Sequence, residues 1–497
     1  MASARRTWLA LGAVTVLGAA LRLPFLSLQS LWYDETFTLA VVEQDTLGKL
    51  WDQVRLSEST PPLYYAITWV WERLIGSTSD AALRAPAAIA GVLCVPAAYV
   101  ALRRFVGERA ALAAAALTAV SPVLVLYSLN ARAYPLLVLL GCLSVWATGE
   151  ALARRRGRWL AIWALLAAAC LWTHYYAGFL IGAELGLLLW RLPGMRLRVA
   201  GAAAAVAALF APLLPLLADQ RDERASHIDS LDLGERVEQA VRQLAAGPNP
   251  PSLALEVVAV ALAAGGIALG GWLALRRAAG AREVALPEAA ASPEAAAPPT
   301  PALLAIVAAA AVVAPLALAV SGVDDHFFMR NLLVAWVAFA GVAALGLTRL
   351  RAIPLGLALA AGLALVVATH ADWRHQNADW EGALAKLGPS LEGRPVVVLP
   401  GFDAPVANTY LDRKVVTHPL PAQSAWVIVE PGREGRSDLS EQSGYPRAAP
   451  PGFRPTVTRT HRGFRMILIE AGAPATLDPG ALGPDQLEQR PVALAPP

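Results

Sequence analysis

Long apolar stretches alternate along this chain with two kinds of polar loop. Each stretch approaches the twenty or so apolar residues that a helix needs to cross a bilayer, and we count about eleven crossings between Trp8 and Thr369. One set of loops is rich in arginine, whereas the other set carries aromatic residues, carboxylates and histidines. Backbone polar groups within lipid must be hydrogen-bonded inside their own segment, so this pattern predicts an α-helical polytopic membrane protein.

The composition agrees with a membrane protein. Only 16% of the 497 residues are charged, whereas about a quarter are charged in a typical soluble protein. The net charge of +3 gives no indication of a nucleic-acid partner, and we expect none. Cys94, Cys142 and Cys170 all lie in apolar stretches, where a thiol usually acts as a small hydrophobic group.

The arginine-rich loops predict the orientation, because short cytoplasmic loops carry the excess of Lys and Arg. These loops contain Arg5-Arg6, Arg103-Arg104-Arg109, Arg154 to Arg158, Arg191 to Arg198, Arg276-Arg277-Arg282 and Arg349-Arg351. The N-terminus is therefore expected in the cytoplasm. The stretch Trp8 to Leu26 is expected to be a retained first span rather than a signal peptide, since it has no small-x-small cleavage site. The Ala-rich, Lys-poor composition suggests a GC-rich bacterial genome, and we expect the protein in the bacterial plasma (inner) membrane.

The region from Trp159 to Trp190 is too long for one ordinary span. Arginines flank both of its ends, which places both ends in the cytoplasm and requires an even number of crossings. We therefore predict a hairpin of two short helices with His174 and Tyr175 at its outer tip. The other expected spans are residues 8–26, 83–102, 110–126, 135–152, 199–218, 253–275, 302–320, 332–347 and 353–369.

Residues 1–370 are predicted to form the transmembrane domain, and two of its segments are not spans. Residues 27–82 read as the first extracytoplasmic loop, with interfacial helices expected at Thr36 to Leu50 and Leu63 to Leu74. The Pro/Ala/Glu-rich residues 279–301 read as a disordered cytoplasmic linker.

Residues 371–497 are more polar and predict a small extracytoplasmic α/β domain. Short β-branched runs with turn signals around them predict strands at Pro395 to Leu399, Trp426 to Val429 and Met466 to Ile469. A helix is expected over Ala404 to Leu411.

Asp34 and Glu35 follow the first span directly. Carboxylates so close to hydrocarbon are costly and tend to be functional. The alternative is structural, because acidic residues also suit the N-terminus of the helix that follows.

Arg84, Arg132 and Arg330 lie among the outer motifs, against the general trend of the chain. A guanidinium can bind a phosphate with two parallel hydrogen bonds, which is one reason to place it there. The other possible reason is an ion pair with a nearby carboxylate.

The remaining candidates are His174 with Tyr175, and the run Asp324-Asp325-His326. His174 could act as a ligand, a base or a hydrogen-bond donor, or it could simply be a hydrogen-bonded residue that separates the two helices. The run could hold a divalent cation only if Asp34 or Glu35 completed the oxygen ligands, so a metal site and a metal-free site both stay open.

Several of these motifs, taken in order, resemble one family. They are Trp32-Tyr33-Asp34-Glu35, Pro61-Pro62-Leu63-Tyr64-Tyr65, Leu83-Arg84-Ala85-Pro86, Ala119 to Tyr134, Thr173-His174-Tyr175-Tyr176, Phe327 to Leu333 and Asn377 to Ala383. The chain is similar to the superfamily of dolichyl-phosphate-mannose protein mannosyltransferases and lipid A aminoarabinose transferases, which are polytopic glycosyltransferases of the GT-C fold. It departs from many relatives at Thr60, where they have His, and at Asn331, where Tyr is common.

The resemblance implies a sugar donor on a polyprenyl phosphate and transfer of a hexose or pentose, with Asp34 as the base of an inverting reaction. Glu35 would orient the acceptor or complete a metal site. Arg132, Arg84 and Arg330 would stabilise the departing phosphate. Tyr33, Tyr64, Tyr134, His174, Tyr175 and His326 would contact substrate.

The acceptor implied by the resemblance is a glycan, a lipid or a protein. Two other functions fit the same architecture. One is a ligase or polymerase of lipid-linked polysaccharide, and the other is a transporter or lipid flippase. Transporters usually place ionisable groups near the bilayer midplane and carry internal repeats, whereas the acids of this chain gather in loops.

Overall fold

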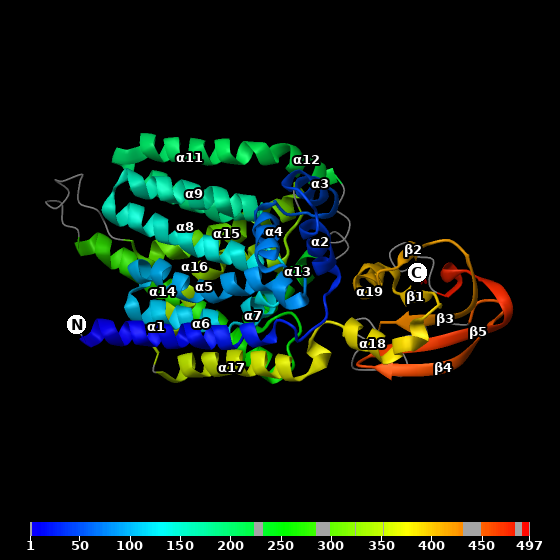
Figure 1. The fold of residues 1–497 in the computed structure, drawn as a ribbon. Helices are drawn as coiled ribbons and strands as arrows, with labels where there is room; N and C mark the ends of the chain where they lie inside the picture. Colours follow the sequence, from blue (N-terminus) through cyan, green and yellow to red (C-terminus); the bar gives the residue numbers. More distant parts are fainter. Residues whose placement is uncertain are drawn as a thin grey trace. The chain divides into compact units, whose positions relative to one another are not determined.

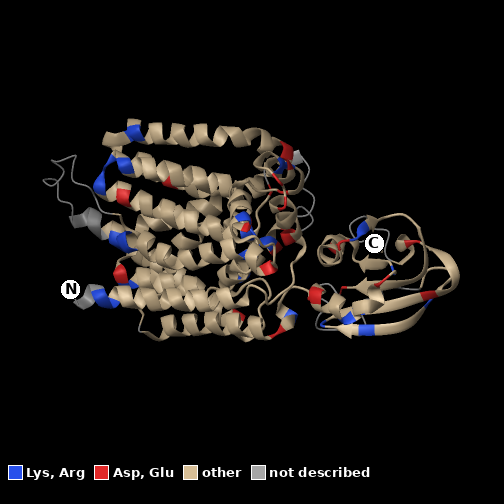
Figure 2. Ribbon diagram, viewed as in Figure 1, with Lys and Arg blue, Asp and Glu red and all other residues tan. Residues whose placement is uncertain are grey.

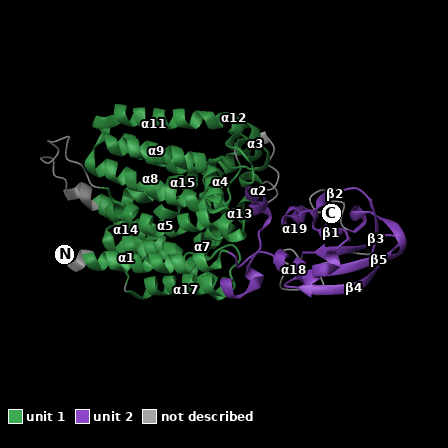
Figure 3. Cartoon of the chain, viewed as in Figure 1, with its two compact units in different colours: residues 1–26, 40–369 green, residues 27–39, 370–497 purple. Residues whose placement is uncertain are grey.

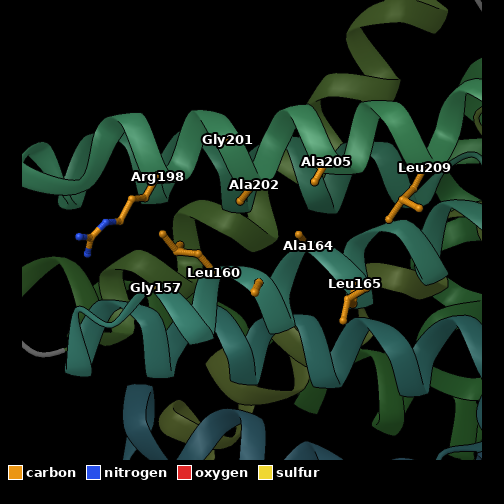
Figure 4. A pocket seen from close by; sticks show the side chains of 10 residues that line it. Gly157, Leu160, Ala164, Leu165, Arg198, Gly201, Ala202, Ala205 and Leu209 are labelled. Atoms are coloured by element: carbon orange, nitrogen blue, oxygen red, sulfur yellow. The ribbon is translucent and has the colours of Figure 1, made fainter.

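A computed structural model describes residues 2–222, 232–284, 299–323, 325–350, 352–430, 449–482 and 490–496. Its contacts divide the chain into two compact units (Figure 3). The membrane unit comprises residues 1–26 and 40–369, and the C-terminal unit comprises residues 27–39 and 370–497. Residues 27–39, which we assigned to the transmembrane domain, thus group with the C-terminal unit.

The membrane unit is a bundle of helices that run side by side (Figure 1). Eight helical segments among the described residues are long and apolar enough to cross a membrane, and a bent pair, α6 and α7, adds a ninth. The chain is a multi-pass membrane protein, whereas the number of eleven spans stays a prediction. The helices of the bundle are α1 Ala2–Ala20, α5 Asp80–Val106, α6 Glu108–Val120, α7 Pro122–Ser128, α8 Tyr134–Arg154, α9 Gly157–Thr173, α10 Ala177–Arg191, α11 Arg196–Phe210, α12 Leu214–Asp222, α14 Leu253–Val284, α15 Pro301–Ser321, α16 Trp336–Leu347 and α17 Ala352–Ala371.

The region from Trp159 to Trp190 forms two helices, as the arginine pattern predicted. Helix α9 ends at Thr173 because His174 adopts an extended conformation (φ −161°, ψ 131°), and α10 starts at Ala177. At 17 and 15 residues, both helices are shorter than an average span.

The structure describes only part of the linker predicted over residues 279–301. Helix α14 runs to Val284, and residues 285–298 lie outside the described residues.

The span expected over residues 110–126 is not one straight helix, because the chain bends by 54° between α6 and α7. Pro122 has no N–H, so the carbonyl of Thr118 loses its helical donor. The buried guanidinium of Arg22 supplies one at 3.3 Å, and donates at 2.9 Å to the carbonyl of Ala119 as well. It also donates at 3.1 Å to Ser128 Oγ on α7.

The expected helix from Thr36 to Leu50 is wrong, since two helices replace it. Helix α2 (Tyr33–Val42) ends before α3 (Leu47–Ser57), and Thr46 caps α3 by accepting the N–H of Lys49 at 3.3 Å. Helix α4 (Leu63–Ile75) agrees with the prediction, and α13 (Leu233–Ala246) was not expected.

Glycines allow α14 and α16 to approach closely. A Cβ atom built on Gly270 would lie 1.9 Å from the carbonyl oxygen of Val342, and one on Gly346 would lie 2.1 Å from that of Gly266. Close backbone approach of this kind supports helix association in lipid, where the hydrophobic effect contributes little.

Besides a smaller group of arginines toward the other end, the membrane unit has a cluster of arginines at the end of the bundle that holds the N-terminus (Figure 2). Helix α5 brings Arg103 and Arg104 to that end, and α8 brings Arg154. The same two helices begin close to Arg84 and Arg132, so these motif residues lie at the opposite end.

The C-terminal unit contains a six-stranded sheet with strand order β2-β6-β1-β3-β5-β4. Strands β1 and β3 are parallel, and the other pairs are antiparallel. The three predicted strands and the predicted helix are confirmed, whereas β2, β4 and β6 were not expected. The elements are α18 Trp380–Leu387, β1 Val396–Leu399, α19 Ala404–Leu411, β2 Lys414–Val416, β3 Leu420–Val429, β4 Phe453–His461, β5 Phe464–Leu477 and β6 Val492–Ala495.

Candidate functional site

A buried ion pair lies at the motif end of the membrane unit. Arg132, in the turn between α7 and α8, donates from Nη1 and Nη2 to the two carboxylate oxygens of Glu58 at 2.8 and 2.9 Å. Arg132 is 6% exposed and Glu58 is 2% exposed. A charge buried this deeply needs a partner in good geometry, and the bidentate pair provides it.

Sequence reasoning missed Glu58. It included the neighbouring motif Pro61-Pro62-Leu63-Tyr64-Tyr65, but not the carboxylate three residues before it. The signal in the sequence was an acidic residue close to that motif.

Gln220 holds the backbone of Glu58 in place, and Tyr175 in turn holds the side chain of Gln220. Gln220 Nε2 donates to the carbonyl of Glu58 at 2.7 Å, and the hydroxyl of Tyr175 donates to Gln220 Oε1 at 2.8 Å. Tyr65 lies with its ring centre 6.0 Å from the Arg132 guanidinium, and its hydroxyl is 2.8 Å from Thr60 Oγ1. Burial raises the pKa of Tyr65 well above its usual value, so the phenol stays neutral beside the ion pair.

His174 lies near Arg132 and near a second arginine, Arg330. Its ring is 5% exposed and packs 6.0 Å from the ring of Tyr134. Burial, together with the positive charges of Arg330 and Arg132, lowers the pKa of His174 to about 3. The structure thus brings together four of the predicted residues, Arg132, Arg330, His174 and Tyr134.

The tautomer of His174 follows from its hydrogen bond. Nδ1 lies 3.2 Å from the backbone nitrogen of Tyr176 and accepts its N–H. The neutral imidazole must then carry its proton on Nε2, which makes that atom a donor. With so low a pKa, His174 is a poor general base at neutral pH, but its Nε2–H can donate to an anionic oxygen.

Two other predicted residues have structural partners. Arg84 on α5 is buried and donates from Nη1 to the carbonyl of Leu26 at 2.8 Å. Asp325 accepts both Nη1 and Nη2 of Arg236, each at 2.7 Å, and this hydrogen bonding lowers the pKa of Asp325. Arg236 on α13 is another residue that the sequence did not single out.

His326, Arg330 and Tyr64 have partners close to the ion pair or in the segment that holds Arg330. The backbone carbonyl of His326 accepts Nδ2 of Asn331 at 2.8 Å, and the guanidinium of Arg330 lies 5.3 Å from the ring centre of Phe328. Tyr64 is buried beside Tyr65, at 5.6 Å between ring centres.

The residues proposed to hold a metal do not form a ligand set in the part of the chain that the structure describes. No group of three or more His, Cys, Asp or Glu side chains suited to a metal occurs there. Asp324 lies outside the described residues, and Asp325 is already held by Arg236. No step of the reaction is therefore assigned to a metal.

Asp34 and Glu35 lie in the first turn of α2, within the C-terminal unit. Glu35 is completely buried, and its Oε2 accepts the N–H of Trp32 at 3.2 Å. Glu35, at the third position of α2, therefore caps the N-terminus of this helix by accepting the backbone N–H of the residue before it. We had considered this capping role for Asp34. Asp34 is half-buried, and Tyr33 packs edge-on against Phe37 and Phe402, with ring centres 4.9 and 5.9 Å away.

Known proteins resemble this chain in sequence and in fold. Residues 59–218, about a third of the chain, match the family described as dolichyl-phosphate-mannose-protein mannosyltransferase. The crystal structure of ArnT from Cupriavidus metallidurans in the apo state superposes with a TM-score of 0.55 at 13% identity, covering 94% of this chain and 98% of that one. The chain has the GT-C fold.

A second structure of the same ArnT, bound to undecaprenyl phosphate, has a similar fold to this chain as well. It superposes with a TM-score of 0.52 at 13% identity and covers 96% of this chain and 99% of that one. No curated protein sequence matches the chain. The family match and the fold together confirm the resemblance that the ordered motifs indicated.

Proposed function

We propose that this protein transfers a hexose or pentose from a polyprenyl-phosphate donor to an acceptor hydroxyl, with inversion at the anomeric carbon. The observation that carries the proposal is the gathering of Arg132, Arg330 and His174 in the motif loops of a GT-C bundle. The family match to mannosyltransferases that use a lipid phosphate supports the donor class. So does the undecaprenyl phosphate bound to ArnT, a protein of the same fold.

The arginine cluster suits the departing phosphate. Arg132 lies in the turn before α8, and its Nη1 and Nη2 both donate to the carboxylate of Glu58. Glu58 also fixes the direction of the guanidinium before substrate arrives, and preorganised donors of this kind stabilise charge that develops in a transition state. His174 adds a neutral donor, and Arg330 adds a second cation; Arg84 is proposed for the same role.

Asp34 is proposed as the general base. It takes the proton of the acceptor hydroxyl while the new bond to the anomeric carbon forms and the bond from that carbon to the phosphate oxygen breaks. The polyprenyl phosphate leaves with the electron pair and needs no general acid, because a phosphate monoester is already a fair leaving group. Glu35 supports this step by fixing the start of α2.

The proposed orientation follows the arginines. The end of the bundle with Arg103, Arg104 and Arg154 is assigned to the cytoplasm by the positive-inside rule (Figure 2). The motif loops and the C-terminal unit then face the extracytoplasmic side of a bacterial plasma membrane. The acceptor there is a glycan, a lipid or a protein.

The test is transfer by the purified protein, supplied with a polyprenyl-phosphate sugar that carries a label on the sugar. Asp34→Asn should abolish release of polyprenyl phosphate while the protein stays folded. Asp52→Asn, an exposed carboxylate on α3, is the matched control and should keep full activity. Full activity in Asp34→Asn would remove Asp34 as the base.

The same preparation separates the alternatives. Movement of intact donor across a bilayer without cleavage would favour a flippase. Repeated addition of lipid-linked oligosaccharide to one acceptor would favour the polysaccharide ligase or polymerase.

A further inference from the structure

The chain directly before Asp34 is hydrogen-bonded to the C-terminal unit. The N–H of Leu31 donates to the hydroxyl of Tyr410 on α19 at 2.8 Å. Gln29 Oε1 accepts the N–H of Asn377 at 2.8 Å, and Ser30 Oγ accepts the N–H of Glu381 at 3.1 Å. Each of these contacts joins residues almost 350 or more positions apart in sequence.

Asp379 ties the same segment to the sheet. Its Oδ1 accepts the N–H of Gly382, which caps α18, and lies 3.4 Å from Ser30 Oγ. Its Oδ2 is 2.8 Å from His461 Nε2 and 3.0 Å from Arg462 Nη1, at the turn between β4 and β5. One carboxylate thus connects the segment, α18 and the β4–β5 hairpin.

Apolar contacts complete the attachment. Leu31 is 1% exposed, and Tyr33 packs against the core of the C-terminal unit that includes Trp380 and Trp426. Since α2 begins at Tyr33, the position of Leu31 and Tyr33 sets where the helix starts and the direction in which Asp34 points.

We propose that the C-terminal unit is a positioning element for Asp34, and that Tyr410 is its principal positioning residue. This inference rests on the proposed role of Asp34 as the base. The Tyr410 hydroxyl fixes the backbone three residues before Asp34, in a stretch that no regular helix or strand holds. A displacement of about 1 Å at a reacting group can lower a rate about a hundredfold, so a contact that holds this backbone affects the chemical step.

The test compares Tyr410→Phe with Thr409→Ala in the full-length protein. The first removes the acceptor of the Leu31 N–H but keeps the ring. The second removes a hydrogen bond of similar length that lies within the same helix, from Thr409 Oγ1 to the carbonyl of Pro405 at 3.0 Å.

We expect Tyr410→Phe to lower kcat about tenfold while KM for the donor changes less than about twofold, because the loss acts on the chemical step. Amide exchange of residues 29–35 should become faster. Thr409→Ala should change neither quantity. A wild-type kcat in Tyr410→Phe, or a raised KM with unchanged kcat, would overturn the inference.

Asp34→Asn separates this failure from failure of the proposed function. If Asp34→Asn is inactive and Tyr410→Phe has wild-type kcat, the positioning role alone is rejected. If Asp34→Asn is fully active, the base assignment is rejected, and with it the inference that rests on it. In the Asp34→Asn background, Tyr410→Phe should cause no further loss of residual activity.

Discussion

At the scale of single residues, the Arg132–Glu58 pair decides how the motif end of the bundle is held together. Both groups are buried, so each charge depends on the other. Removing one partner leaves an uncompensated buried charge, which usually costs more than removing the pair.

We predict that Glu58→Gln lowers the free energy of unfolding by about 3 kcal/mol. The double variant Glu58→Gln with Arg132→Gln should recover part of that loss, since no charge is then left unpaired. Chemical unfolding of the four proteins of this cycle measures the coupling. Additive losses would show that the two residues do not interact as the geometry indicates.

His174 gives a prediction for pH. Its pKa of about 3 in the folded protein lies below the ordinary value of 6.5, so below pH 6.5 the unfolded chain binds a proton that the folded protein does not. The folded state therefore loses stability through this residue as pH falls from 6.5 towards 3. Between pH 6.5 and 5 the loss is about 2 kcal/mol.

Comparison of the wild type with His174→Gln isolates this contribution. The wild type should lose more stability than the variant between pH 7 and 5, as measured by unfolding at both pH values. Parallel losses would mean that His174 titrates normally, and the cluster of positive charge around it would be in doubt.

At the scale of elements, the close packing of α14 on α16 can be tested with two neighbouring glycines. Gly270→Ala should lower the free energy of unfolding by about 2 kcal/mol or more, because the new methyl group would overlap the backbone of Val342. Gly271→Ala is the control, since nothing lies within 4 Å of its Cβ position. Equal midpoints of thermal unfolding in the two variants would contradict the packing.

The sequence predicted those elements whose cause is local. Apolar length predicted the spans, and the flanking arginines predicted the α9–α10 hairpin. The bend at Pro122 had a local signal in the proline itself, but its stability depends on Arg22, a residue almost a hundred positions away. The break between α2 and α3 was missed because a continuous helical pattern hid the cap at Thr46.

The candidate site was predictable only in part. The outer arginines could be selected because their position opposes the positive-inside trend, and His174 because it lies at the outer tip of the predicted hairpin. Glu58, Arg236 and Tyr410 could not, because an ordinary acid, arginine or tyrosine becomes informative only through its partner in the fold. The attachment of residues 27–39 to the C-terminal unit is a long-range pairing of the same kind.

At the scale of the whole molecule, the orientation can be measured with introduced cysteines. The native Cys94, Cys142 and Cys170 are all buried, so they provide little background. Lys414→Cys on β2 should react with a membrane-impermeant maleimide in intact cells. Arg277→Cys on α14 should react only after the membrane is permeabilised, and the reverse pattern would invert the proposed topology.

The central claim is sugar transfer from a polyprenyl phosphate by a single inverting displacement. The most direct measurement follows one turnover and determines both the polyprenyl phosphate released and the anomeric configuration of the product by NMR. We predict equal amounts of polyprenyl phosphate and glycosylated acceptor, with the configuration inverted. Retained configuration, or a donor that stays intact, would contradict the account.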